Sequence, residues 1–179
     1  MKRIMVLLAA AAMMAMSGVA QAAPIGDSAD AQCAKLAIRT LGPSVNPSNY
    51  TFIGGSASGD DFTGQGTEEG NDVFCGFGGV VDSMDTLNDG DIFLGGADRD
   101  LVITNSSTFY GQEGNDQVAI NSGTFFGEEG IDSVEFNNGT FYGGDGNDFV
   151  SFNLLDGTFI GGPGNDAVGS GNPPVDGLP

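Results

Sequence analysis

The stretch that decides the fold reads TFYGQEGNDQVAINSG from Thr108, TFFGEEGIDSVEFNNG from Thr124, TFYGGDGNDFVSFNLLDG from Thr140 and TFIGGPGNDAVGS from Thr158. A looser copy, IFLGGADRDLVITNSS, begins at Ile92, so that the copies start 16, 16, 16 and 18 residues apart. One aspartate stands at the same place in every copy: Asp100, Asp116, Asp132, Asp148 and Asp166. Five copies in one register predict a solenoid, because a unit this short buries its apolar residues only by stacking on the next unit.

Within each copy the apolar residues alternate as they do in strands. A phenylalanine stands two residues before the first loop glycine, a valine follows two residues after the aspartate, and a further apolar residue often comes two positions later. Alternation by two places all three sets inside: Phe109, Phe125, Phe141, Phe159; Val102, Val118, Val134, Val150, Val168; and Ile120, Phe136, Phe152. The sequence therefore predicts an all-β fold, a parallel β-solenoid with two short strands and two turns in each coil of about 16 residues.

The regions around the regular coils (92–170) are less uniform. Ser28 as N-cap, Gly42 as C-terminal cap and Pro43 predict a helix over 28–41, within an N-terminal capping segment (23–50) that we expect to cover the open end of the solenoid. Residues 51–91 are predicted to form irregular first coils, and 80–90, which lacks loop glycines, a bulged one. Residues 171–179 are predicted to be a flexible tail.

The N-terminus has the features of a secretion signal. Lys2 and Arg3 precede an apolar run of 13 residues, and Ala20-Gln21-Ala22 matches a cleavage pattern. We therefore expect residues 1–22 to be a signal peptide, cleaved after Ala22, and the protein to be secreted or periplasmic. A retained anchor is the weaker alternative, because 13 apolar residues are too few to span a bilayer comfortably. An exported chain with only Cys33 and Cys75 most simply forms one disulfide; a reactive thiol is the alternative.

Composition excludes several classes of function. The chain has 179 residues, with 24 Asp+Glu against 5 Lys+Arg, a net charge of −19, no His and no Trp. The absence of histidine excludes Ser-His-Asp and Cys-His catalysis and histidine-ligated zinc or haem. The negative charge argues against nucleic acid and anionic lipid as partners. Without cations among its carboxylates, such a chain would repel itself.

The loops of the last copies resemble a known family. GGDGNDFVS at Gly143 is close to the Gly-Gly-x-Gly-x-Asp-x-U-x nonapeptide, with U a large apolar residue, of the repeats-in-toxin (RTX) calcium-binding β-roll. GQEGNDQVA, GEEGIDSVE and GGPGNDAVG are variants of this motif, GGADRDLVI is a weaker one, and the resemblance covers about Thr51 to Gly169. It implies calcium ions between successive loops, bound by backbone carbonyls and by the aspartate that ends each hexapeptide.

The chemistry of the residues points the same way. Calcium takes six to eight oxygen ligands in flexible geometry, and glycines let a loop turn its carbonyls toward one point. We therefore expect about four Ca²⁺ ions, bound by the carboxylates of Asp100, Asp116, Asp132, Asp148 and Asp166 and by loops built on Gly111, Gly114, Gly127, Gly130, Gly143, Gly144, Gly146, Gly161, Gly162 and Gly164. Asp61 and Asp72 are weaker extensions. The alternative without a metal is a solenoid whose Asn and Asp residues are present because they favour tight turns.

The match to the family is incomplete. The family places a calcium loop at both edges of an 18-residue coil, whereas the second edge here is a short Asn-Ser-Gly or Asn-Asn-Gly turn, so we expect one row of ions along one edge. Gln112-Glu113, Glu128-Glu129 and Pro163 also replace glycines or their neighbours, which weakens individual sites. The expected function is a non-catalytic exported module that folds on binding calcium.

A second function could lie on the outer face. By the same alternation Thr108, Thr124 and Thr140 point outward beside Tyr110, Phe126 and Tyr142. An exposed ladder of this kind could bind a polysaccharide or a cell-surface partner, with calcium only structural. The simpler interpretation is that these residues are ordinary pairs between neighbouring coils, which stabilise the sheet.

Overall fold

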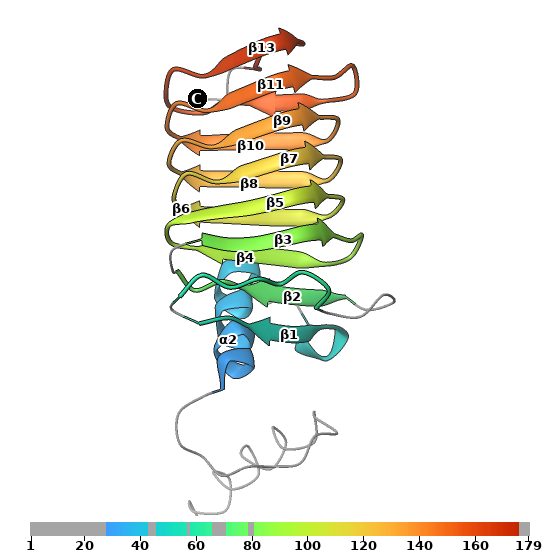
Figure 1. Ribbon diagram of the computed structural model, residues 1–179, viewed down its shortest axis with the longest axis vertical. Helices are drawn as coiled ribbons and strands as arrows, with labels where there is room; N and C mark the ends of the chain where they lie inside the picture. The colour runs from blue at the N-terminus through green and yellow to red at the C-terminus, as the bar shows by residue number, and fades with distance from the viewer. Residues whose placement is uncertain (1–27, 43–45, 57, 66–70, 79–80, 176–179) are drawn as a thin grey trace, which may run out of the picture.

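The computed structural model describes residues 28–42, 46–56, 58–65, 71–78 and 81–175, and in it the chain winds as a parallel β-solenoid (Figure 1). The predicted signal peptide and the last four residues of the predicted tail lie outside the described residues. The first sheet consists of β1 (Thr51–Gly54), β2 (Asp72–Cys75), β4 (Ile92–Gly96), β6 (Thr108–Glu113), β8 (Thr124–Glu129), β10 (Thr140–Asp145) and β12 (Thr158–Ile160). The second consists of β3 (Val81–Leu87), β5 (Arg99–Asn105), β7 (Gln117–Asn121), β9 (Ser133–Asn137), β11 (Phe149–Asn153) and β13 (Ala167–Gly171).

The register of the strands confirms the predicted coil of about 16 residues. Every pairing is parallel, with Thr108 opposite Thr124, Thr124 opposite Thr140 and Thr140 opposite Thr158. Successive coils therefore place chemically identical residues on top of one another. Two edges join the sheets: Gly-rich loops lead from the first sheet to the second (the glycine edge), and short turns lead back (the asparagine edge).

The core is a stack of phenylalanines facing a row of valines. Phe109, Phe125 and Phe141 are fully buried, and their ring centroids lie 4.8 Å apart with the planes within 5° of parallel. Burying one such ring contributes about 1.5–3 kcal/mol, so the stack supplies much of the stability of the regular coils. The valines of the second sheet, from Val102 to Val150, are buried opposite it.

The prediction was wrong for the third apolar set. Ile120, Phe136 and Phe152 are exposed over 45%, 38% and 46% of their surface. After Val118 the paired positions skip one residue before Ile120 pairs with Phe136, so the alternation breaks there. The next residue, Asn121, is the one buried in the corner.

The buried asparagines form a ladder along the asparagine edge. The side-chain N–H₂ of Asn121 donates to Oδ1 of Asn137 at 2.8 Å and to the carbonyl of Thr140 at 3.2 Å. The same bonds link Asn105 to Asn121 and Asn137 to Asn153. An amide has both donors and acceptors, so this edge satisfies its buried polar groups by itself.

The upstream coils are more regular than predicted. The bulged coil predicted over 80–90 is instead the seven-residue strand β3, which pairs with β5 and places Asp82 opposite Asp100. Its loop glycines precede the strand, at Gly76 and Gly78, rather than lying within the segment.

The helix forms where it was predicted but covers a different surface. α2 (Ala29–Leu41) begins at Ser28, whose hydroxyl accepts from the N–H of Ala31, and ends at Gly42 with φ 80°. It lies mainly across the outer face of the first sheet (Figure 1), where it buries Val73 and Leu94. Only its first turn reaches the end of the solenoid. There Asp30 Oδ1 accepts from the N–H of Gly54 on the outermost strand, which protects part of that edge.

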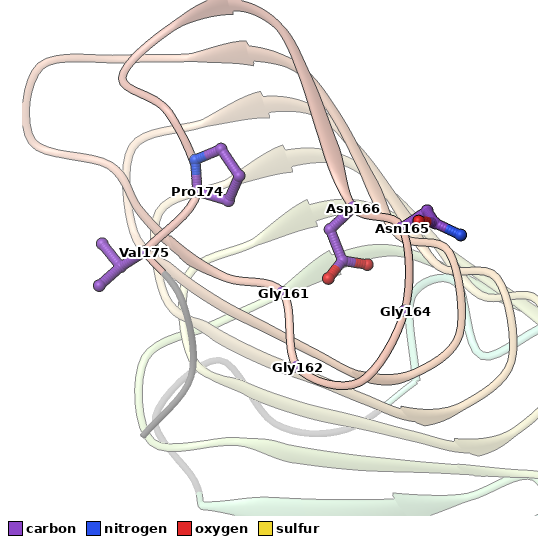
Figure 2. A pocket seen from close by; sticks show the side chains of 7 residues that line it. All are labelled: Gly161, Gly162, Gly164, Asn165, Asp166, Pro174 and Val175. Atoms are coloured by element: carbon purple, nitrogen blue, oxygen red, sulfur yellow. The ribbon is translucent and has the colours of Figure 1, made fainter. Parts of the chain in front are cut away.

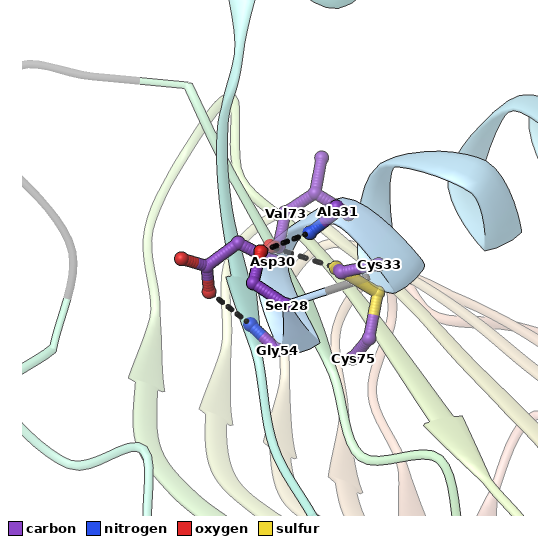
Figure 3. Close-up of a disulfide and its surroundings, with 7 residues drawn as sticks. All are labelled: Ser28, Asp30, Ala31, Cys33, Gly54, Val73 and Cys75. Atoms are coloured by element: carbon purple, nitrogen blue, oxygen red, sulfur yellow. Dashed lines mark hydrogen bonds between the residues drawn. A yellow bond between two sulfur atoms is a disulfide. The ribbon is translucent and has the colours of Figure 1, made fainter. Parts of the chain in front are cut away.

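The predicted disulfide is confirmed. Cys33 of α2 and Cys75 of β2 are bonded with both residues fully buried (Figure 3). The bond fastens the helix to the face of the sheet, and such bonds persist in oxidising compartments. No helix within the described ranges is long and apolar enough to cross a membrane.

Replacing both cysteines, Cys33→Ala with Cys75→Ala, should lower the free energy of unfolding by about 3–4 kcal/mol, since the bond closes a loop of 42 residues in the unfolded chain. Urea unfolding followed by circular dichroism measures this. The single variants serve as controls and should lose nearly as much as the double variant. Equal stability of the oxidised and reduced proteins would contradict the expectation.

Candidate functional site: the aspartate ladder

A column of seven aspartates runs along the glycine edge, one in each coil. We call this column the aspartate ladder: Asp60, Asp82, Asp100, Asp116, Asp132, Asp148 and Asp166. Its five later members are the aspartates predicted from the repeat. Four of these, from Asp100 to Asp148, are buried, whereas Asp166 on the last coil is partly exposed.

Each carboxylate holds the backbone of the coil before it. Oδ1 of Asp132 accepts from the backbone N–H of Asp116 at 2.7 Å, and Oδ1 of Asp148 accepts from that of Asp132 at 2.8 Å. The residue after the aspartate adds a second bond, since the N–H of Ser133 donates to the carbonyl of Asp116 at 2.9 Å. The same pattern extends to Asp60, whose N–H reaches Oδ1 of Asp82 at 2.6 Å.

The other carboxylate oxygen lies against a glycine. A Cβ placed on Gly111 would stand 2.0 Å from Oδ2 of Asp116, and one on Gly127 would stand 2.1 Å from Oδ2 of Asp132. Neither glycine has a positive φ, so space rather than backbone conformation requires it. The same contact recurs at Gly95, Gly143 and Gly161, which explains why every copy keeps the first loop glycine.

The second loop position has the opposite requirement. Gly144 and Gly162 have φ of 105° and 99°, and Gln112 and Glu128 occupy the same position with φ of 77° and 76°. The two replacements therefore keep the path of the loop, at a cost of about 1–2 kcal/mol each for a left-handed residue that is not glycine.

The loop carbonyls do not all turn inward as expected. The carbonyls of Glu129 and Asp145 accept from the N–H groups of Gly114 and Gly130 on the preceding loops, at 2.8 and 2.9 Å. The carbonyls of Gly161 and Pro163 accept in the same way from Gly144 and Gly146. Hydrogen bonding between coils thus continues around the edge. Each of these oxygens keeps a second lone pair.

Five ladder oxygens are buried with no hydrogen-bond partner in the described structure: Oδ2 of Asp82, Asp100, Asp116, Asp132 and Asp148. A buried acceptor without a partner is destabilising, and a buried charge more so. Each of these oxygens therefore requires either a proton or a cation to be stable in the folded protein.

Burial changes the acidity of these groups. It raises the pKa of Asp100 to about 8, with the neighbouring charge of Asp116 adding to the effect. It raises the pKa of Asp116 to about 7, of Asp132 to about 8 and of Asp148 to about 6. Without a cation, the raised pKa values of Asp100 and Asp132 therefore favour their protonated forms at neutral pH, whereas the lower pKa of Asp148 leaves that carboxyl mostly ionised.

The two edges use different residues at comparable buried positions. All seven members of the aspartate ladder are Asp, and the buried corner of the other edge is Asn in four consecutive coils, from Asn105 to Asn153. Turn preference alone would allow either residue at either edge. The asparagine edge has the buried Asp72 and Asp91 in its first coils and Asn in the four coils that follow, whereas the glycine edge has Asp in every coil. The constant Asp indicates that the glycine edge needs a group that is acceptor-only when ionised.

Sequence reasoning missed two members of the ladder and misplaced two candidates. Asp60, rather than its exposed neighbour Asp61, starts the ladder, and Asp82 joins it through the glycine at position 76. Asp72 follows a loop-like Gly-Asn pair in the sequence, yet it lies on β2 at the asparagine edge, where its N–H donates to Asp91 Oδ1 at 3.0 Å. Gly55 and Gly76 precede Asp60 and Asp82 by five and six residues, but Gly55 and Gly66 precede Asp61 and Asp72 by six residues as well, so spacing alone does not separate the two pairs.

The ladder offers one carboxylate at each level rather than a cluster. In the part of the chain that the structure describes, no three acidic or cysteine side chains converge on a point that could hold a metal ion. Any ion here would take its remaining ligands from the backbone or water. At the C-terminal end the last loop opens into a pocket of about 370 Å³, with Asp166 pointing into it between Gly161 and Gly164 (Figure 2).

The predicted outer ladder also exists, on the first sheet. Tyr110, Phe126 and Tyr142 lie side by side, with centroids 4.8 Å apart and planes within 9° of parallel. Their faces therefore cover one another, and mainly their edges face solvent. A sugar stacks on a free ring face, so this arrangement does not favour polysaccharide binding.

Comparisons with models of known families, with curated proteins and with solved structures give no match to this chain.

The contact between glycine and carboxylate can be tested with a double-mutant cycle. Gly111→Ala should lower the free energy of unfolding by about 2 kcal/mol or more, because its Cβ would overlap Oδ2 of Asp116. In an Asp116→Ala background, where the carboxylate is gone, the penalty should shrink by at least about 1 kcal/mol. Strictly additive effects in urea unfolding would show that the two residues do not interact.

The raised pKa values predict how stability depends on pH without metal. The unfolded chain loses these protons near pH 4, while the native ladder keeps them up to about pH 6–8. The stabilisation is therefore complete below about pH 4 and is lost as the pH rises through that window. In a chelator, the β-structure measured by circular dichroism should therefore decrease steadily from about pH 5 to about pH 9. The chain has no histidine, which leaves few other groups to titrate there, and a flat profile would refute the shifts.

Proposed function

We propose that this protein is an exported calcium-binding β-solenoid, in which the aspartate ladder binds a row of divalent cations that stabilises the fold. The observation that carries the proposal is the column of five buried carboxylate oxygens that have no hydrogen-bond partner among the described residues, in positions occupied by Asp and never by Asn. A carboxylate that only needed to accept one backbone N–H could be replaced by an amide. The second, inward-facing oxygen is what an amide would lack.

The donor set suits calcium. The ladder supplies hard oxygen ligands only, and calcium accepts carboxylates, carbonyls and water together in irregular numbers. The residues that would hold the ions are Asp100, Asp116, Asp132, Asp148 and Asp166, with the second lone pairs of the loop carbonyls. Asp82 and Asp60 lengthen the row beyond the predicted four ions. Bound calcium would supply positive charge beside carboxylates that the coil buries.

The proposed role is structural rather than catalytic. Ions that bind only the folded coil shift the folding equilibrium by mass action. We therefore expect the chain to be expanded where calcium is scarce and to fold after export. The buried disulfide agrees with an oxidising destination, and the loop motif agrees with an RTX-type module. The predicted signal peptide belongs to this proposal.

Calcium titration by calorimetry, with circular dichroism in excess chelator, tests the proposal. We expect several ions per chain and a large gain of β-structure on binding. No heat of binding, together with unchanged β-structure in chelator, would overturn it and would leave a metal-free solenoid with protonated carboxyls.

One substitution distinguishes these two states by the sign of its effect. Asp132→Asn removes a buried charge, so it should raise the amount of β-structure retained in chelator at about pH 8 and lower both stability and the number of bound ions in calcium. Asp156→Asn is the matched control, because Asp156 is exposed and outside the ladder. Destabilisation by Asp132→Asn of the same size in both buffers would count against a cation at this level.

A further inference from the structure

Among the described residues, the aspartate ladder ends at Asp166, with no further aspartate stacked on it. At each earlier level two hydrogen bonds tie the aspartate backbone to the next coil. The N–H of Asp148 donates to Oδ1 of Asp166 at 2.9 Å, and the carbonyl of Asp148 accepts from the N–H of Ala167 at 2.9 Å. Asp166 is the last member, and among the described residues neither its N–H nor its carbonyl has a hydrogen-bond partner.

We infer that the C-terminal end of the second sheet binds an extended peptide segment that carries an aspartate. The segment would add as a parallel strand beside β13. Its carboxylate would accept from the N–H of Asp166, and the next N–H of the segment would donate to the carbonyl of Asp166. This inference goes beyond the proposed calcium function and does not depend on it.

The space for such a carboxylate is already present. The pocket of about 370 Å³ above the last loop lies between the loop residues Gly161, Gly162, Gly164, Asn165 and Asp166 and the C-terminal residues Pro174 and Val175 (Figure 2). In the earlier coils the corresponding space holds the carboxylate of the next aspartate, packed against the next loop glycine. Six successive levels therefore define the chemistry of the ligand: an extended backbone with one acidic side chain.

Among the described residues no strand pairs with the outer edge of β13, whereas the outer edge of β12 is covered. On the first sheet Val175 pairs with Ile160, and its N–H donates to the carbonyl of Phe159 at 2.7 Å, which blocks the edge of β12. On the second sheet the N–H of Ala167 points back to β11. By alternation the N–H and carbonyl of Val168 face the free side. An exposed strand edge of this kind is a template for strand addition.

A second copy stacked end to end fits less well than a peptide. At the N-terminal end the first turn of α2 lies over β1, with Asp30 bonded to Gly54. At the C-terminal end Val175 covers β12. The covered strands belong to the same sheet, so these two covers would meet if copies stacked in register. A single extended segment needs only the open half.

Binding can be measured with a peptide of the chain's own sequence. The probe is an acetylated, amidated GNDFVSFN peptide, which copies 146–153 and carries the ladder aspartate, and the control is GNAFVSFN. In calcium-containing buffer we expect ¹⁵N-labelled protein to show shift changes confined to Asp166–Gly171, and the control to bind at least about tenfold more weakly. Equal binding of both peptides, or chemical-shift changes confined to the outer face of the first sheet around Tyr110, would overturn the inference.

Variants of the protein separate edge pairing from packing. Val168→Pro removes an edge-facing N–H and should abolish binding, whereas Val168→Ala loses similar packing but keeps the N–H and should bind as the wild type does. Circular dichroism shows whether each variant retains the solenoid. Undiminished binding to a folded Val168→Pro variant would also overturn the inference. A full-length copy that competes with the peptide and dimerises through this end would instead assign the site to self-association.

Discussion

One carboxylate buried against one glycine in every coil is the constraint on which the glycine edge depends. Oδ1 ties each coil to the one before it, and Oδ2 occupies the space that a Cβ would fill. Removing the carboxylate leaves a cavity and an unpaired backbone N–H, and replacing the glycine makes its Cβ overlap Oδ2. This mutual requirement accounts for the loop glycine and the aspartate being present together in every regular coil, and for the recurrence of the pair five or six residues apart in the irregular ones.

The repeat predicted the architecture because its period is set by geometry: a residue that stacks on its own equivalent must recur once per coil. It therefore identified the phenylalanine stack, the valine row and five members of the aspartate ladder. It failed where local alternation breaks. Ile120, Phe136 and Phe152 follow an apparently regular pattern, but the strand turns a corner after the valine and gives the buried place to asparagine. The direction of a corner depends on tertiary packing, which alternation alone does not encode.

The helix gives a second example. Its boundaries followed from Ser28 and Gly42, because capping is a local property. Its position did not, because Val73 and Leu94 lie on the outer face of coils that looked irregular in the sequence. Covering the side of a solenoid removes apolar surface from water over several coils, while covering the end would protect only one strand. The length of the helix covers the side of the solenoid, and its first turn covers part of the end.

The asparagine ladder and the aspartate ladder make the two edges respond to different conditions. From Asn105 to Asn153 the amide edge is neutral and satisfied by its own hydrogen bonds, so protons and ions have little influence on these coils. The acidic edge repeats once per coil in the same way, but its stability depends strongly on protons and ions. In a solenoid built in this way, a change in pH or ion concentration would loosen the contacts between coils along the glycine edge only. The coils would stay bonded along the asparagine edge, which keeps them in the register from which the glycine edge can form again.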